Sequence, residues 1–121
     1  MLSEEVTYLL QQTRMAISRI ESNTESIADV DDFYKSPGGM LRLESTCMLL
    51  MAIGESLKGI DKLTNKELLA RYPEVDWKGA KGLRDVIAHR YFEIDAEIVL
   101  GVVKNQIPHM KEVIERIISE N

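Results

Sequence analysis

The sequence predicts an all-α protein, a four-to-five-helix up-and-down bundle that forms one domain over residues 1–121. Apolar residues recur at spacings of three and four through most of the chain, as they do on the buried face of a helix. No turn dipeptide separates two segments of alternating polarity, so no β-hairpin is expected. The composition, 45% hydrophobic and 29% charged, is typical of a globular chain that buries one core.

The first helix is expected over residues 3–28, because one apolar stripe runs through this segment. Residues 29–39 are expected to form a loop, since acidic side chains there are followed by Pro37, Gly38 and Gly39. The members of the stripe are Val6, Leu9, Leu10, Thr13, Ile17, Ile20 and Ile27.

The second helix is expected over residues 40–61. Gly54 lies in its middle, where glycine costs about 1 kcal/mol relative to alanine, so a close contact with another helix is expected there. The chain has one cysteine, Cys47, which lies in an apolar stretch and is expected to be a buried, unreactive thiol. The buried stripe comprises Leu43, Cys47, Leu50, Met51, Gly54 and Leu57.

A short third helix is expected over residues 66–72. Thr64 and Glu67 have the spacing of a capping box that opens it, and Pro73 helps to end it.

Two longer helices follow, and each begins after an aspartate that can cap it. Asp76 precedes a helix expected over residues 77–92, and Asp95 precedes a final helix that runs to about Ser119. Pro108 is expected to kink this last helix, because proline lacks the N–H that an interior helical position donates.

Charge and hydropathy exclude several classes of protein. The net charge of −5 argues against a protein that coats nucleic acid through bulk positive charge, so any RNA contact must be local. The longest apolar run, residues 47–53, is too short to span a membrane, and Glu4 and Glu5 stand where a secretory signal would be basic. A cytoplasmic location without membrane association is expected.

Common catalytic and binding motifs are missing from the sequence. There is no phosphate-binding loop, dinucleotide fingerprint or H-E-x-x-H zinc motif. His89 and His109 share no metal-ligand spacing with Cys47. The sequence therefore predicts neither a metal site nor a cofactor.

Residues 77–92 are locally basic. They contain four Lys or Arg side chains and one acidic side chain, Asp85, which gives a local net charge of +3. Such a contrast can concentrate a phosphate-bearing partner, although a basic stretch on a helix is more often a solvated surface. Candidate RNA-binding residues among the four are Lys78, Lys81 and Arg90, beside Arg84.

Helical spacing gives this segment more specific chemistry. Asp85 and His89 are four residues apart and share a face, so the carboxylate can orient the imidazole, and it raises the histidine pKa together with the nearby helix C-terminus. Arg84 and Tyr91 share a second face, whereas Arg84 and His89 lie about 140° apart around the axis. One helix does not bring Arg84 and His89 together, but a two-fold pairing with a second copy can.

The segment R-D-V-I-A-H-R-Y, Arg84 to Tyr91, resembles the R-x4-H-x-Y motif of HepT-like (DUF86) proteins of the HEPN superfamily. The segment MLLMAIGESLKGI resembles the I-G-E helix of that family, and YPEVDWKGAKGLRDVIAHRYFEID resembles its P-x-x-x-W, R-x4-H and Y-F-x-x-D run. Together these cover most of residues 40–100. Asp85 departs from the family pattern, in which asparagine is common at this position.

The resemblance implies a homodimer with a metal-independent endoribonuclease site in the dimer cleft. It also implies a toxin–antitoxin pair with a minimal nucleotidyltransferase (MNT) as antitoxin. His89 would be the general acid or base, Arg84 would stabilise charge on the phosphate, and a 2′,3′-cyclic phosphate would be the product. Tyr91 resembles the tyrosine that the antitoxin modifies with AMP, and Asp85 is the supporting residue.

Other interpretations of the same residues remain open. Arg84 can belong to a surface ion pair, His89 can be an ordinary helix-end histidine, and Tyr91 can be a core aromatic residue. The main alternative function is a catalytically idle HEPN protein that serves as the binding partner of a nucleotidyltransferase. A nucleotide-binding adaptor has less support, because the chain is acidic and has no phosphate-binding loop.

Overall fold

The computed structural model describes residues 2–89 and 93–121, without the side chain of His89. The described residues contain no strand, so the prediction of an all-α fold is confirmed. The helices are α1 (Glu4–Thr24), α2 (Asp31–Tyr34), α3 (Pro37–Thr64), α4 (Glu67–Ala70), α5 (Trp77–His89), α6 (Ala96–Gly101) and α7 (Ile107–Glu120), with a π-helical segment (Val102–Gln106) between the last two.

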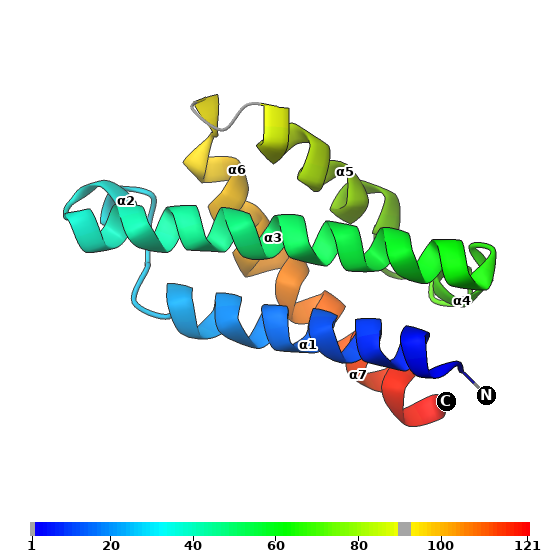
Figure 1. Cartoon of the computed structure of the whole chain (residues 1–121). Helices are drawn as coiled ribbons and strands as arrows, with labels where there is room; N and C mark the ends of the chain where they lie inside the picture. Colours follow the sequence, from blue (N-terminus) through cyan, green and yellow to red (C-terminus); the bar gives the residue numbers. More distant parts are fainter. Residues whose placement is uncertain (1, 90–92) are drawn as a thin grey trace.

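The long helix α3 is the centre of the bundle. It runs antiparallel to α1 on one side and packs against α5 on the other, while α6 and α7 cross behind α1 and α3 (Figure 1). Leu57 and Ile60 of α3 and Ile114 of α7 are fully buried. The position of α5 is therefore set mainly by the face of α3 on which it packs.

Cys47 lies in the core on α3, as the sequence predicts. Its side chain is 1% exposed, and burial raises the pKa of the thiol to about 11. The thiol is therefore neutral and unreactive at physiological pH. Among the described residues, no helix combines the length and the apolar character needed to cross a membrane.

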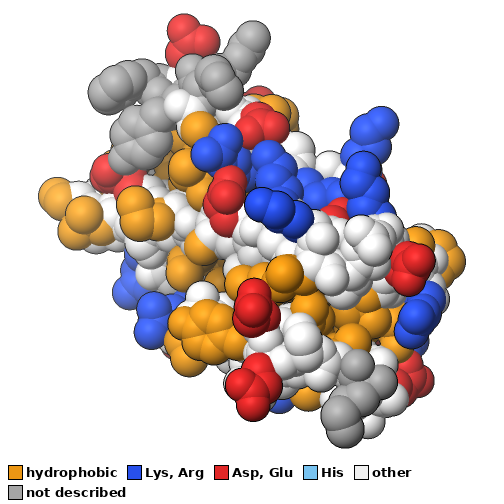
Figure 2. Space-filling view, turned by 45° about the vertical axis from the view of Figure 1, so that its right-hand side comes forward, with side chains coloured by type: hydrophobic (Ala, Val, Ile, Leu, Met, Phe, Trp, Pro, Cys, Tyr) orange, Lys and Arg blue, Asp and Glu red, His pale blue; other side chains and the backbone are white. Residues whose placement is uncertain are grey.

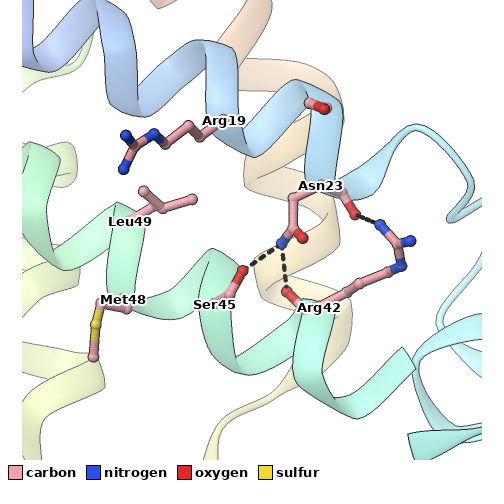
Figure 3. Close-up of a pocket in the computed structure, with 7 residues that line it drawn as sticks. Arg19, Asn23, Arg42, Ser45, Met48 and Leu49 are labelled. Atoms are coloured by element: carbon pink, nitrogen blue, oxygen red, sulfur yellow. Dashed lines mark hydrogen bonds between the residues drawn. The ribbon is translucent and has the colours of Figure 1, made fainter. Parts of the chain in front are cut away.

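Asn23, near the end of α1, ties that helix to the start of α3 (Figure 3). Its Nδ2 donates to the carbonyl oxygen of Arg42 at 2.9 Å, to Ser45 Oγ at 2.7 Å and to Thr46 Oγ1 at 3.0 Å. The Nη1 of Arg42 donates in return to the carbonyl oxygen of Asn23 at 2.8 Å. These bonds fix the register of α1 against α3.

The expected loop over residues 29–39 is wrong in part, because it contains α2 and the start of α3. Ser36 caps α3 by accepting a hydrogen bond from the Gly39 N–H at 3.0 Å, and Pro37 occupies the first turn, where its missing N–H costs nothing. A Cβ on Gly39 would lie 2.7 Å from the carbonyl oxygen of Phe33, so this glycine lets α2 approach α3.

The predicted capping box at Thr64 and Glu67 is wrong in part, because Lys66 and not Thr64 is the N-cap of α4, although Thr64 Oγ1 accepts a hydrogen bond from the Leu68 N–H at 3.5 Å. Thr64 is the last residue of α3, and its hydroxyl donates to the carbonyl oxygen of Ile60 at 2.8 Å. The chain then turns through two left-handed residues, Asn65 with φ 53° and Lys66 with φ 64°, before α4 begins. Lys66 thus caps α4 by position and makes no side-chain hydrogen bond to it.

Both predicted aspartate caps are confirmed. The Gly79 N–H donates to Asp76 Oδ1 at 2.9 Å, and Asp95 Oδ1 accepts from the N–H groups of Glu97 at 2.9 Å and Ile98 at 3.4 Å. The backbone after Asp95 is helical without a break over residues 96–120, but a π-helical segment replaces the α-helix over Val102–Gln106, immediately ahead of Ile107 and Pro108.

Candidate active site

A glycine lets α5 approach α3 where Arg84 leaves the helix. A Cβ on Gly54 would lie 2.8 Å from the Cβ of Arg84, which is closer than real Cβ contacts allow, and 3.4 Å from the carbonyl oxygen of Ala80. This confirms the close helix contact predicted at Gly54. The same contact fixes the base of the Arg84 side chain against α3.

The guanidinium of Arg84 is held by two carboxylates. Its Nε lies 2.6 Å from Glu55 Oε1 on α3, and its Nη1 donates to Asp85 Oδ1 at 2.9 Å. Lys58 Nζ lies 3.5 Å from the same oxygen of Asp85, so the four side chains form one ionic cluster. The Arg84 side chain is 37% exposed, which leaves it in reach of a ligand from solvent.

Within the ionic cluster, the contacts favour the charged forms of Arg84 and Asp85. The hydrogen bond from Arg84 and the positive charge of Lys58 lower the pKa of Asp85, and the hydrogen bond to Asp85 with the charge of Glu55 raises the pKa of Arg84. The guanidinium is therefore a permanent cation in a defined direction. Its contacts to the carboxylates use Nε and Nη1, and a guanidinium has a third nitrogen, Nη2, with two further donors that can bind a phosphate.

His89 is the last residue of α5, so the helix has the length that the spacing argument assumes. Because Arg84 and His89 belong to one α-helix, their backbone positions lie about 140° apart around its axis. The side chain of His89, the predicted contact of Asp85 with it, and the residues Arg90 and Tyr91 lie outside the described residues.

The two remaining candidates, Lys78 and Lys81, lie on the α5 face that meets the C-terminal half of α3. Lys81 forms an ion pair with Asp61, whose side chain is 9% exposed, whereas Lys78 is exposed. Sequence analysis did not single out Glu55 as an Arg84 partner, although it stands in the I-G-E segment. The spacing of residues along one helix does not show which side chain of another helix it meets.

The sequence model of the HepT-like ribonuclease family matches residues 13–117 of this chain, which include every described member of the ionic cluster. The chain belongs to the HepT-like ribonuclease family. Its Arg84 and His89 therefore stand in the helix in which the family resemblance places the R-x4-H motif.

Named relatives agree with the family match. A protein of Methanocaldococcus jannaschii, provisionally named as an RNase, is 38% identical over 71 residues, which are 59% of this chain and 55% of that protein. A second protein of that organism, whose name joins a gamma-glutamylcyclotransferase to a provisionally assigned RNase, is 28% identical over 98% of this chain and 50% of that protein. The chain thus spans about half the length of these two relatives.

A third relative is similar along about nine tenths of its length. A protein of Thermococcus cleftensis, provisionally named ribonuclease HepT, is 29% identical over 111 residues, which are 89% of this chain and 91% of that protein. No solved structure matches the chain. In the part of the chain that the structure describes, no group of three or more His, Cys, Asp or Glu side chains is arranged to hold a metal ion.

Proposed function

We propose that this HepT-like protein is an endoribonuclease that cleaves RNA without a metal, through Arg84 and His89. The observation that carries the proposal is the Arg84 guanidinium, which is charged, oriented by Glu55 and Asp85, and still partly exposed. It lies on α5, which ends at His89. A fixed cation and an imidazole are the two groups that phosphodiester transfer to a ribose hydroxyl needs.

In the proposed reaction His89 removes the proton from a ribose 2′-hydroxyl. The 2′-oxygen attacks the adjacent phosphorus, the bond from phosphorus to the 5′-oxygen breaks, and that oxygen takes a proton. The products are a 2′,3′-cyclic phosphate and a 5′-hydroxyl. Arg84 stabilises the additional negative charge on the phosphate oxygens in the transition state.

The active species is proposed to be a homodimer, because Arg84 and His89 stand about 140° apart around the axis of one helix. Two strongly exposed apolar side chains of α3, Leu41 at 65% and Met48 at 71%, give a surface that a second copy can cover. Met48 also lines an open groove of about 480 Å³ between α1 and α3 (Figure 3). Glu55 follows Met48 by two helical turns on α3, so a two-fold axis near this face would bring both Arg84 side chains together.

The protein is further proposed to be the toxin of a pair whose antitoxin is a minimal nucleotidyltransferase. In that pair, the Tyr91 oxygen attacks the α-phosphorus of ATP, and pyrophosphate leaves. The alternative function is a catalytically idle partner of the nucleotidyltransferase. It is supported by the ion pairs of the Arg84 guanidinium with two carboxylates, because these pairs can also be purely structural. RNA cleavage by the purified chain would distinguish a ribonuclease toxin from an idle partner.

Purified protein is expected to cleave single-stranded RNA in excess chelator as fast as in magnesium, because neither an imidazole nor a guanidinium needs a metal ion. The products are expected to end in 2′,3′-cyclic phosphate. Gel analysis of end-labelled RNA, with and without phosphatase and acid treatment, identifies the termini. Cleavage that stops in chelator and returns with magnesium would show that a metal-dependent step is rate-determining instead.

Co-expression with the proposed minimal nucleotidyltransferase antitoxin is expected to add one AMP to Tyr91 and to suppress RNA cleavage. The added phosphate is an anion that can pair with Arg84, and the adenosine blocks access to it. Peptide mass spectrometry locates the modification, and Tyr91→Phe is the control that keeps the ring. Suppression with AMP on another residue, or with none, would assign neutralisation to a different mechanism.

A further inference from the structure

An open hollow of about 480 Å³ lies between the C-terminal half of α3 and α5, beside the ionic cluster. Figure 2 shows Lys and Arg side chains gathered on the corresponding part of the surface. Five lysines surround it, four from the two helices and one from the turn after α3, and we call it the lysine groove. Its lining residues are Lys58, Asp61, Lys62, Lys66, Lys78, Lys81, Gly82 and Asp85.

The lysine groove is positive although the whole chain carries −5. Five lysines stand against two aspartates, a charge of +3. Lys81 and Lys58 are paired with Asp61 and Asp85, so their charge is largely offset. The surplus belongs to Lys62, Lys66 and Lys78, which are all exposed and have no carboxylate within ion-pair distance among the described residues.

Helical geometry explains why two of these side chains share a face. Lys58 and Lys62 are four residues apart on α3, about 6 Å along its axis, and Lys66 follows in the turn after Thr64. Lys66 is held at the far end by the left-handed turn that terminates α3. The near end reaches Asp85, which is bonded to Arg84. The lysine groove therefore leads to the catalytic arginine.

We infer that the lysine groove binds the sugar-phosphate backbone of the RNA on one side of the cleaved bond. This inference rests on the proposed function and extends it to residues of α3. Ammonium groups on flexible stems contact phosphates without selecting a base, so the groove would add affinity and leave sequence preference to other contacts. A backbone of regularly spaced anions fits a row of cations that begins at Arg84.

The test compares two triple variants in a His89→Ala chain, in which RNA is bound but not cut. The first is Lys62→Gln, Lys66→Gln and Lys78→Gln. The matched control removes the same charge elsewhere through Lys35→Gln, Lys104→Gln and Lys111→Gln. Fluorescence anisotropy with a labelled single-stranded RNA gives Kd at several salt concentrations, and circular dichroism checks that each variant is folded.

The groove variant is expected to bind RNA at least about tenfold more weakly at ~0.1 M salt, because three phosphate contacts are lost. The slope of log Kd against log salt is expected to fall by about 2, since each contact to a single strand contributes about 0.7. The control is expected to stay within about twofold of the His89→Ala chain, because its lysines lie away from the groove. Chains with His89 intact should show a higher KM and an unchanged kcat.

Equal RNA affinity of the groove and control variants would overturn the inference and favour an acidic protein as the occupant of the groove. Absence of RNA binding by the His89→Ala chain would overturn it as well. A different result would contradict the proposed ribonuclease function without contradicting the lysine groove. A chain with both catalytic residues that binds RNA through these lysines but never cleaves it supports the groove and contradicts the ribonuclease proposal.

Discussion

Replacing Arg84 by alanine is expected to reduce the kcat of RNA cleavage by about 10²–10³-fold, because a preorganised cation that stabilises transition-state charge is worth that much. The fold should survive, since the guanidinium is partly exposed and its partners Glu55 and Asp85 are open to solvent. Single-turnover cleavage and thermal unfolding measure the two effects separately.

The control for this loss is Arg14→Ala, which removes an exposed arginine from α1 and should leave cleavage unchanged. Arg84→Lys should recover little activity, because an ammonium cannot bond Glu55, Asp85 and a phosphate in one plane. Mixing Arg84→Ala with His89→Ala chains should restore part of the activity if the site is shared between two copies. Wild-type cleavage by Arg84→Ala would remove the arginine from catalysis and favour the idle-partner alternative.

Gly54→Leu is expected to lower the free energy of unfolding by about 3 kcal/mol and the Tm by roughly 10 °C. The position is buried, and even a Cβ there would lie 2.8 Å from the Cβ of Arg84, which is part of the α5 framework and cannot rotate away. Separation of the helices would also displace the guanidinium from Glu55. RNA cleavage should therefore fall even at temperatures where the variant stays folded.

Gly101→Ala is the matched control for this prediction. A Cβ on Gly101 would have no neighbour within 4 Å, so the substitution should stabilise the helix by up to about 1 kcal/mol and leave cleavage unchanged. Chemical denaturation of both variants gives the comparison. A Gly54→Leu chain as stable as the wild type would show that the contact between α3 and α5 relaxes at little cost.

The helices could be predicted because each depends on residues close together in the sequence. A close contact at Gly54 could be predicted because glycine in the middle of a helix costs stability, but the helix that it meets, α5, could not. Apolar stripes locate α1 and α3, and the side chains of Asp76 and Asp95 cap helices that begin one residue later. The start of α3 could not be predicted from Pro37, because proline is as compatible with the first turn of a helix as with a loop. The sequence thus predicted the order of the main helices better than the point at which α3 begins.

The site was predictable only along α5. Arg84, His89, Lys78 and Lys81 could be chosen from their spacing in one segment. The contact of Glu55 with Arg84 depends on how α3 lies against α5, and no local pattern contains that information. The lysine groove has one local signal, the interval of four residues between Lys58, Lys62 and Lys66, but the pattern alone is also typical of a solvated helix face.

Both ends of the chain lie on one side of the bundle, and the end of α5 lies on the other (Figure 1). This arrangement makes the fold modular. A second domain, a tether or a fluorescent protein joined at either terminus would extend away from the end of α5. Two copies could then associate while each carries such an attachment, and the fold is suited to being one unit of a larger polypeptide.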